Sequence, residues 1–135
     1  MQKTITLSTD RKNGLYDITS EVVSIIKSTE VHAGIASVYA RGSTCAIMIQ
    51  ENWDQSIQND VITLLNKMIP TGIWEHDRQD DNGDAHLKAG LIGPSETIPI
   101  MDNKPGLSTW QNIFFCEFDG PRKQREVVVT IIGEK

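Results

Sequence analysis

Two histidines, His76 and His86, flank an acidic loop and are the first candidates for chemistry in this sequence. Imidazole exchanges protons near neutral pH, and together with carboxylates it binds divalent transition metals. The sequence therefore predicts a general acid–base pair or a metal site at this loop, with two solvated histidines as the alternative. Their ten-residue spacing matches no standard zinc motif. The carboxylates between them are Asp77, Asp80, Asp81 and Asp84.

A second group of polar residues has the chemistry to hold an anion. Residues 41–44 and 93–95 form turns rich in hydroxyls and backbone donors. Lys88, Arg122 and Arg125 add positive charge, and arginine makes two-pronged contacts with phosphate. The sequence contains no Walker A pattern and no dinucleotide fingerprint. The alternatives are hairpin turns and a solvated strand end.

Glu51 and Asn52 follow a predicted buried strand and precede a predicted helix. Polar groups often project from such a junction, so Glu51 is a candidate base or ligand. The alternative is an acid that the helix dipole stabilises. We interpret Trp53 and Trp74 as packing residues, and His32 as a helix-end or loop residue without a catalytic role.

Composition restricts the class of protein. The chain has 135 residues, 18 acids and 13 bases, giving a net charge of -5, which argues against a general nucleic-acid binder. Cys45 and Cys116 lie in apolar runs and are expected to be buried, reduced thiols. The first ten residues lack the apolar core of a signal peptide, and no run is long enough to span a membrane. A single cytoplasmic domain over residues 1–135 is the expectation.

The elements that position these residues follow from periodicity. Strands are predicted at 4–8, 34–39, 44–50, 96–101, 110–118 and 127–132, and the second and third are expected to form a hairpin. A helix capped by Asp17 or Thr19 buries Ile18, Val22, Ile25 and Ile26, and a second helix, capped by Asp54, ends before Pro70. Residues 76–84 are expected to be a loop, and 86–91 a short helix or strand. This order predicts an α+β fold with a largely antiparallel sheet or sandwich and two main helices.

Three strings together resemble one known family. They are GSTCAIMIQEN, AHLKAGLIGPSETIPI and STWQNIFFCEFDGPRKQREVVVTIIGE, which start at residues 42, 85 and 108. They are similar to the YjbQ family of small stand-alone proteins, which is associated with a secondary thiamine-phosphate-synthase activity. The resemblance extends over nearly the whole chain. It implies an α+β fold, a homotrimer and a polar site near a subunit interface.

The resemblance also implies which residues form that site. It suggests His76, His86, Glu51 and Asp119 as catalytic residues, with Asp119 or Glu117 orienting a histidine. The implied substrate-binding residues are Ser43, Thr44, Asn52, Ser95, Trp110, Gln111 and Arg122, to which Lys88 is added for its positive charge. Many family members carry His-Thr-Thr where this chain has Gly42-Ser43-Thr44. A metal site that needs a third histidine is therefore incomplete, which leaves His76 and His86 with a carboxylate or Cys116.

The expected function is that of a small enzyme acting on a phosphorylated small molecule. The related activity joins a pyrimidine pyrophosphate to a thiazole phosphate and releases pyrophosphate. Arg122, Lys88 and a divalent metal ion of unknown identity would hold the anion, while His76 or His86 transfers a proton. The alternative is a trimeric module that binds a metal or an anion without turnover. A purely structural trimer is the third interpretation.

Overall fold

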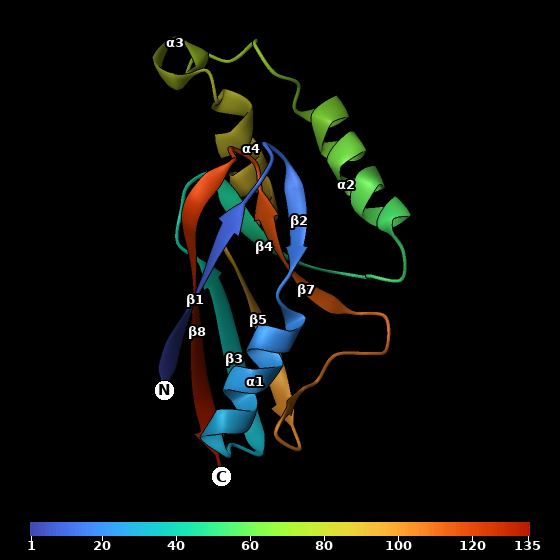
Figure 1. Cartoon of the computed structure of the whole chain (residues 1–135), viewed down its shortest axis with the longest axis vertical. Coiled ribbons are helices and arrows are strands. Elements are labelled where there is room, and N and C mark those ends of the chain that lie inside the picture. Colours follow the sequence, from blue (N-terminus) through green and yellow to red (C-terminus); the bar gives the residue numbers. More distant parts are fainter.

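Two antiparallel sheets form the framework of the computed structural model, which describes residues 1–135 (Figure 1). The larger sheet has the strand order β1–β8–β3–β5–β6, and the smaller has the order β2–β7–β4. All strand pairs are antiparallel, which confirms the predicted α+β class. The strands are β1 (Gln2–Thr9), β2 (Gly14–Asp17), β3 (Ala33–Ala40), β4 (Cys45–Gln50), β5 (Ser95–Met101), β6 (Lys104–Pro105), β7 (Asn112–Glu117) and β8 (Arg122–Glu134).

Four helices accompany the sheets: α1 (Thr19–Thr29), α2 (Gln55–Met68), α3 (Asp77–Asp80) and α4 (Gly83–Ile92). The two predicted helices are α1 and α2, and Asp54 caps α2 as expected by accepting from Ser56 N at 2.8 Å. Residues 86–91, predicted to be a short helix or strand, are helical and belong to α4. The predicted loop at 76–84 contains the single turn α3. No helix is both long and apolar enough to cross a membrane.

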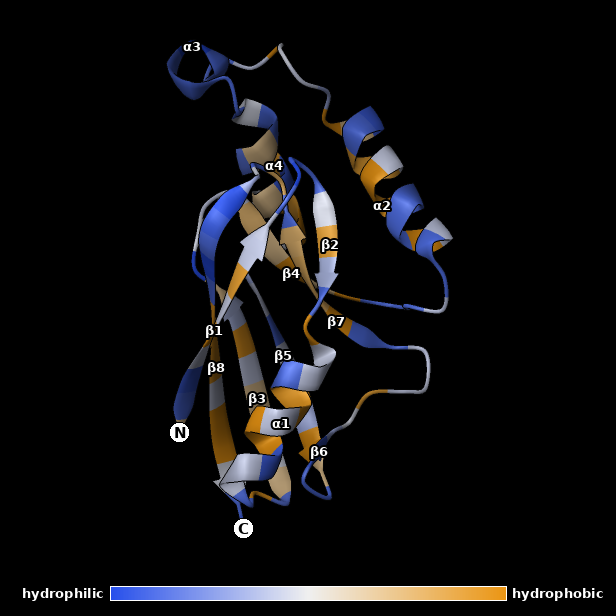
Figure 2. Ribbon diagram, in the orientation of Figure 1, coloured by the Kyte–Doolittle hydropathy of each residue, from blue (hydrophilic) through white to orange (hydrophobic).

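The main hydrophobic core lies between the two sheets and α1. The predicted apolar face of α1 is buried, and it packs with the inner face of the larger sheet and with Ile47, Ile113 and Phe115 of the smaller one. Burial of each large apolar side chain contributes about 1.5–3 kcal/mol, so this shared core holds the layers together. Figure 2 shows hydrophobic residues along the C-terminal half of β8, whereas α3 is hydrophilic throughout.

A second core lies on the other face of the smaller sheet. It joins Phe114, Cys116 and Phe118 to Ala85 and Ala89 of α4. Strand β7 is therefore buried on both faces, as predicted, although it begins at Asn112 and leaves Trp110 and Gln111 in the preceding loop. Both cysteines are unpaired and buried, which confirms their prediction as reduced thiols, and burial raises the pKa of each.

The predicted hairpin of the second and third strands is wrong. Strand β3 pairs with β5 and β8, whereas β4 pairs with β7 in the other sheet. Residues 41–44 connect the sheets instead of forming a tight turn. Arg41 N still donates to Glu126 O of the larger sheet at 3.0 Å, and Phe118 N donates to Thr44 O at 3.1 Å. The doubly buried β7 needs hydrogen-bonding partners on both edges, and β2 and β4 provide them.

Candidate functional site

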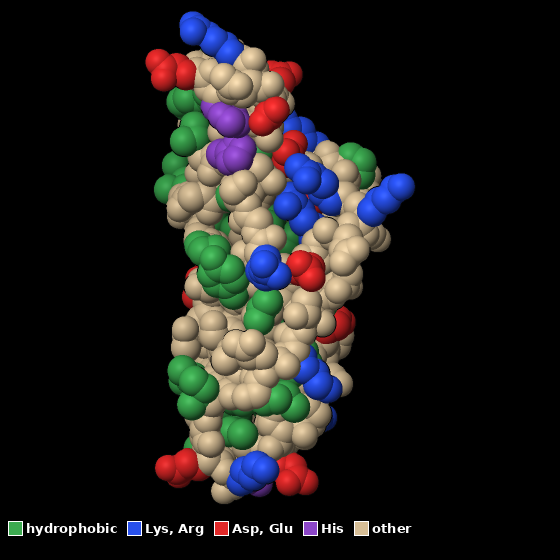
Figure 3. All heavy atoms as spheres, turned by 90° about the vertical axis from the view of Figure 1, so that its left-hand side faces the viewer, with side chains coloured by type: hydrophobic (Ala, Val, Ile, Leu, Met, Phe, Trp, Pro, Cys, Tyr) green, Lys and Arg blue, Asp and Glu red, His purple; other side chains and the backbone are tan.

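His76 and His86 meet within one chain. Their ring centroids lie 4.6 Å apart with the planes at 76°, an edge-to-face contact. His76 Nε2 also lies 3.7 Å from Asp80 Oδ2. Figure 3 shows the two imidazoles side by side, with hydrophobic side chains next to them. They border a pocket of about 600 Å³ that Ile73, Trp74 and Leu87 also line.

The carboxylate of Asp77 brings the two histidines together. Its Oδ1 accepts from Gly83 N at 2.8 Å, and its Oδ2 accepts from Trp74 N at 3.1 Å. One side chain thus ties the segment before α3 to the first residue of α4. These two backbone N–H groups lower the pKa of Asp77, because they stabilise its charged form. A Cβ on residue 83 would lie 2.9 Å from Asp77 Oδ1, so glycine permits the close approach.

The donor set for a metal ion is incomplete in one chain. No group of three or more His, Cys, Asp or Glu side chains is placed to hold a metal. Catalytic zinc sites use three protein ligands, and here two imidazoles converge without a third. Cys116 is fully buried in the second core, away from solvent. One chain therefore offers two nitrogen ligands at most.

Asp119 and Arg122 bind each other and the start of α4. Arg122 Nη2 and Asn82 Nδ2 each donate to Asp119 Oδ2 at 2.9 Å. Asn82 O in turn accepts from His86 N at 3.3 Å. Asp119 thus connects to His86 only through the backbone of Asn82, and it makes no hydrogen bond to an imidazole. The guanidinium of Arg122 is half-exposed and stays accessible to an anion.

Thr44, Glu117 and Arg125 belong to a buried network. Arg125 Nε donates to Glu117 Oε1 at 2.9 Å, and Arg125 Nη2 donates to Thr44 Oγ1 at 2.9 Å. Thr9 Oγ1 donates to Glu117 Oε1 at 2.8 Å. Burial alone would lower the pKa of Arg125, but the hydrogen bond that Arg125 donates to Glu117 raises it above its ordinary value. Arg125 is therefore engaged inside the protein.

Lys88 is also enclosed, with a side chain only 1% exposed. Its ammonium donates to Asn66 Oδ1 at 2.6 Å and to Asp84 Oδ2 at 3.3 Å. Burial lowers the pKa of Lys88, and the charge of Asp84 opposes that shift. Ser43 and Ser95, by contrast, are exposed, the first between the sheets and the second at the start of β5.

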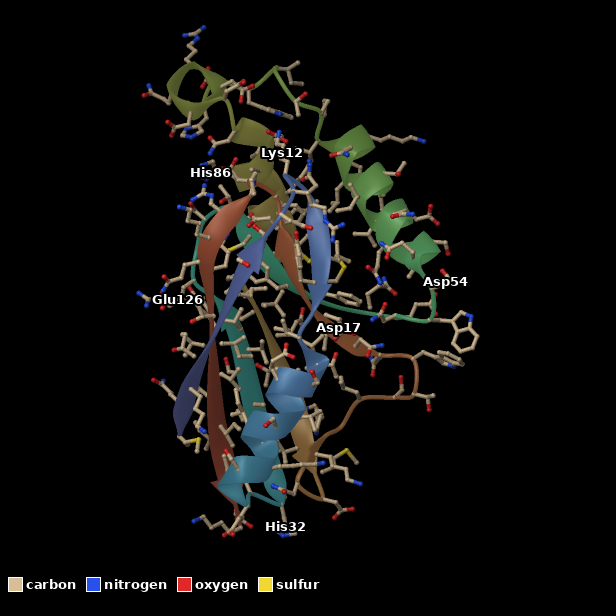
Figure 4. The ribbon with its side chains drawn as sticks, viewed as in Figure 1. Lys12, Asp17, His32, Asp54, His86 and Glu126 are labelled. Carbon is tan, nitrogen blue, oxygen red and sulfur yellow. The ribbon has the colours of Figure 1, made fainter.

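Four other predicted site residues gather at the far end of the smaller sheet. Gln50 pairs with Asn112 there, so Glu51 and Asn52 leave β4 beside Trp110 and Gln111, which precede β7. Asn52 Nδ2 donates to Asp17 Oδ2 at 2.6 Å. Figure 4 shows Asp54 on the side of the molecule away from His86, and Asp17 near its middle. The predicted site residues thus form separate groups within one chain.

The prediction that Trp53 is a packing residue is wrong. Its ring is 71% exposed and contacts Trp110, which is 53% exposed, edge to face at 5.2 Å. Sequence reasoning also missed the bridge made by Asn82, for which the only local signal is the Asn82-Gly83 turn pair.

The chain is similar to known proteins over nearly its whole length. Residues 3–134 match the family described as "UPF0047 protein YjbQ-like". The chain is 46% identical to UPF0047 protein MJ1081 of Methanocaldococcus jannaschii over 96% of this chain and 92% of that protein. It is 34% identical to UPF0047 protein YugU of Bacillus subtilis over 90% and 92%.

Solved structures show the same fold. A YbjQ-like protein of unknown function from Sulfolobus solfataricus superposes with a TM-score of 0.96 at 36% identity, covering 99% of this chain and 97% of that one. The hypothetical protein APE1520 of Aeropyrum pernix gives a TM-score of 0.94 at 31% identity, with 99% of each chain covered. The sequence match and the fold together place this chain in the UPF0047 (YjbQ-like) family.

Proposed function

We propose that this chain is a cytoplasmic enzyme that acts on a phosphorylated small molecule at the pocket bordered by His76 and His86. The observation that carries the proposal is the contact of two imidazoles at 4.6 Å beside a pocket of about 600 Å³. Two adjacent imidazoles are suited to take up and return a proton, and the pocket volume lies in the usual range for small ligands. Arg122 does not line this pocket, but its guanidinium is half-exposed and can pair with an anionic group of the substrate.

The specific reaction proposed resembles thiamine-phosphate synthesis. A pyrimidine pyrophosphate is joined to a thiazole phosphate, and pyrophosphate leaves. In this scheme one histidine donates a proton to the departing pyrophosphate, Arg122 pairs with an anionic group, and Ser43 and Ser95 donate hydrogen bonds. Because Lys88 is enclosed and donates to Asn66 of α2 and to Asn13, its part is to hold α4 in place and not to contact the leaving group.

Self-association as a homotrimer is part of the proposal. Glu51, Asn52, Trp110 and Gln111 lie where Gln50 of β4 pairs with Asn112 of β7, and none of them lines the histidine pocket. A closed ring of copies brings different sides of neighbouring subunits together, so the second group of one chain can complete the site of the next. The outer face of the larger sheet supports association, because Ile35 and Ile132 pair there while 44% and 65% exposed.

The experiment is an assay of pyrophosphate release from the two phosphorylated substrates. His76→Ala and His86→Ala are compared with wild type and with His32→Ala, a histidine at the opposite end of the molecule (Figure 4). We expect each of the first two variants to lose about 100-fold or more in kcat, with unchanged circular dichroism. His32→Ala retains full activity. Turnover that persists in both pocket variants would contradict the proposal.

A second candidate function is a trimeric module that binds a metal or anion without turnover. The adjacency of His76 and His86 favours it, since each chain supplies two imidazole ligands. Elemental analysis of untagged wild type and both histidine variants separates the candidates. Stoichiometric metal in wild type alone, without substrate turnover, supports the binding module. If neither histidine variant changes metal content or activity, the interpretation as a purely structural trimer is supported.

A further inference from the structure

We propose that a polar pocket between the β1–β2 turn and α2 binds a small oxyanion, separately from the histidine site. The pocket has a volume of about 310 Å³. No carboxylate lines it, although the chain has 18 acids against 13 bases. Its polar lining consists of Arg11, Asn13, Gln55, Gln58, Asn59 and Thr63. A cation surrounded by amides and a hydroxyl selects a negatively charged ligand.

The hydrogen bonds within the walls leave donors free. Asn13 Oδ1 accepts from Lys88 Nζ at 3.4 Å, which leaves the Asn13 amide NH₂ without a partner in the chain. Asn59 Oδ1 accepts from Gln55 Nε2 at 3.4 Å, and the Asn59 NH₂ is free in the same way. Two side-chain oxygens are thus occupied while their NH₂ groups are available. An oxyanion, which only accepts hydrogen bonds, matches this arrangement.

The guanidinium of Arg11 is held at the pocket. It lies 5.1 Å above the centre of the Tyr16 ring. A Cβ on Gly14 would come within 2.5 Å of Arg11 Nε, so glycine makes room for the side chain to lie across β2. The ion pair of Arg11 joins Nε to Asp10 Oδ1 at 3.6 Å and leaves the terminal nitrogens free. These are the groups that bind phosphate or carboxylate oxygens in pairs.

The side of the pocket opposite α2 carries more positive than negative charge. Behind Asn13, Lys12 and Lys88 share the single carboxylate of Asp84, each at 3.3 Å. With Arg11 and Asp10, three cations face two carboxylates in this region. Lys88 and Asp84 are both buried, so solvent screens their field less than that of surface charges.

The pocket is distinct from the histidine site. Lys88 follows His86 by two residues on α4, which places their side chains roughly 200° apart around the helix. Lys88 points to Asn13 at the new pocket, whereas His86 contacts His76. The volume lies near the lower end for ligand sites, so it suits a small polyol carrying a phosphate or carboxylate group.

The test is a titration followed by amide NMR shifts and calorimetry, with glycerol 3-phosphate, inorganic phosphate and glycerate as probes. Arg11→Gln removes the cation, and Asn59→Asp replaces a free donor with a negative charge. Arg41→Gln is the matched control, because Arg41 is an exposed arginine whose ion pair with Glu126 is also 3.6 Å long. We expect the dissociation constant to rise about tenfold or more in the two pocket variants and to stay within about twofold in the control.

The outcomes separate the possibilities. Tighter binding of glycerol 3-phosphate than of glycerate identifies a phosphate ligand, and the reverse order identifies a carboxylate. Absence of binding to wild type at about 10 mM probe would overturn the proposal, as would equal binding by Arg11→Gln, Asn59→Asp and wild type. Loss of binding in His86→Ala instead of Arg11→Gln would assign the anion to the histidine site. Since the histidine variants test the proposed function, the two proposals fail independently.

Discussion

Glu117 and Arg125 form an ion pair enclosed between the two sheets, with Arg125 Nε 2.9 Å from Glu117 Oε1. Glu117 ends β7 of the smaller sheet and Arg125 lies near the start of β8 of the larger one. Thr9 of β1 donates to the same carboxylate, and Thr44, just before β4, accepts from the guanidinium. Four chain segments are therefore joined through one pair of charges, which fixes the connection between the sheets.

Removal of one member of this pair is expected to be strongly destabilising. Glu117→Ala leaves Arg125 buried without its counter-ion, which costs about 3–5 kcal/mol of unfolding free energy. Urea unfolding monitored by circular dichroism measures this. The double variant Glu117→Leu with Arg125→Met is the control, because it removes both charges and recovers most of the loss. A single variant as stable as wild type would contradict the assigned role.

Gly34 and Gly90 are expected to respond to alanine in opposite directions. A Cβ at position 34 would lie 2.1 Å from Ile132 O, so Gly34→Ala forces β3 away from β8. At position 90, on the exposed side of α4, a Cβ meets nothing within 4 Å. Gly90→Ala should stabilise by about 0.5–1 kcal/mol through helix propensity. Thermal melting of the two variants tests this, and a Gly34→Ala protein that melts at the wild-type temperature would refute the strand contact.

The junction between α3 and α4 should loosen in acid. The pKa of Asp77 is below its ordinary value of 3.8, because the N–H groups of Gly83 and Trp74 stabilise the carboxylate. A depressed pKa contributes stability that is present above 3.8 and is lost as the pH falls through the folded value. NMR signals of the Trp74 indole and the His86 ring should shift in this range while core signals persist. In Asp77→Ala the Trp74 indole should show its acid-type signal already at pH 7.

Trp53 and Trp110 should contribute little to folding. Their edge-to-face contact is worth about 0.5–1.5 kcal/mol, and both rings are largely exposed. A double-mutant cycle with Trp53→Ala and Trp110→Ala measures the coupling. Within the proposed function, Trp110→Ala raises KM while unfolding changes by no more than this amount. A large loss of stability would instead mean that the pair is a structural contact.

The outer face of the larger sheet provides a test of self-association. Ile35 and Ile132 pair on neighbouring strands there and are exposed in the single chain. Ile35→Asp with Ile132→Asp should convert a trimer to monomers in light scattering coupled to size exclusion. Leu64→Asp, which changes an exposed leucine on α2, is the matched control and keeps the trimer. A trimer that survives the double change would place the interface elsewhere.

Local patterns determined several elements of this protein. The spacing of Ile18, Val22, Ile25 and Ile26 defined the buried face of α1, because apolar residues at i, i+4, i+7 and i+8 share one side of a helix. Asp54 correctly predicted the start of α2, because an aspartate side chain can accept a hydrogen bond from the first turn of the helix that follows it. The apolar runs around both cysteines were sufficient to predict their burial.

Long-range contacts decided the rest. Strands β3 and β4 do not form a hairpin because β3 pairs with β8 and β4 pairs with β7. The short segment at residues 41–44 contains no information about these distant partner strands. The same holds for the candidate site. Lys88 was predicted to bind an anionic substrate, but its ammonium is buried and donates to Asn66 and Asp84 instead. His76 and His86 meet because Asp77 bonds to backbone on both sides of α3, a relationship of position in space that residue types and spacing do not contain.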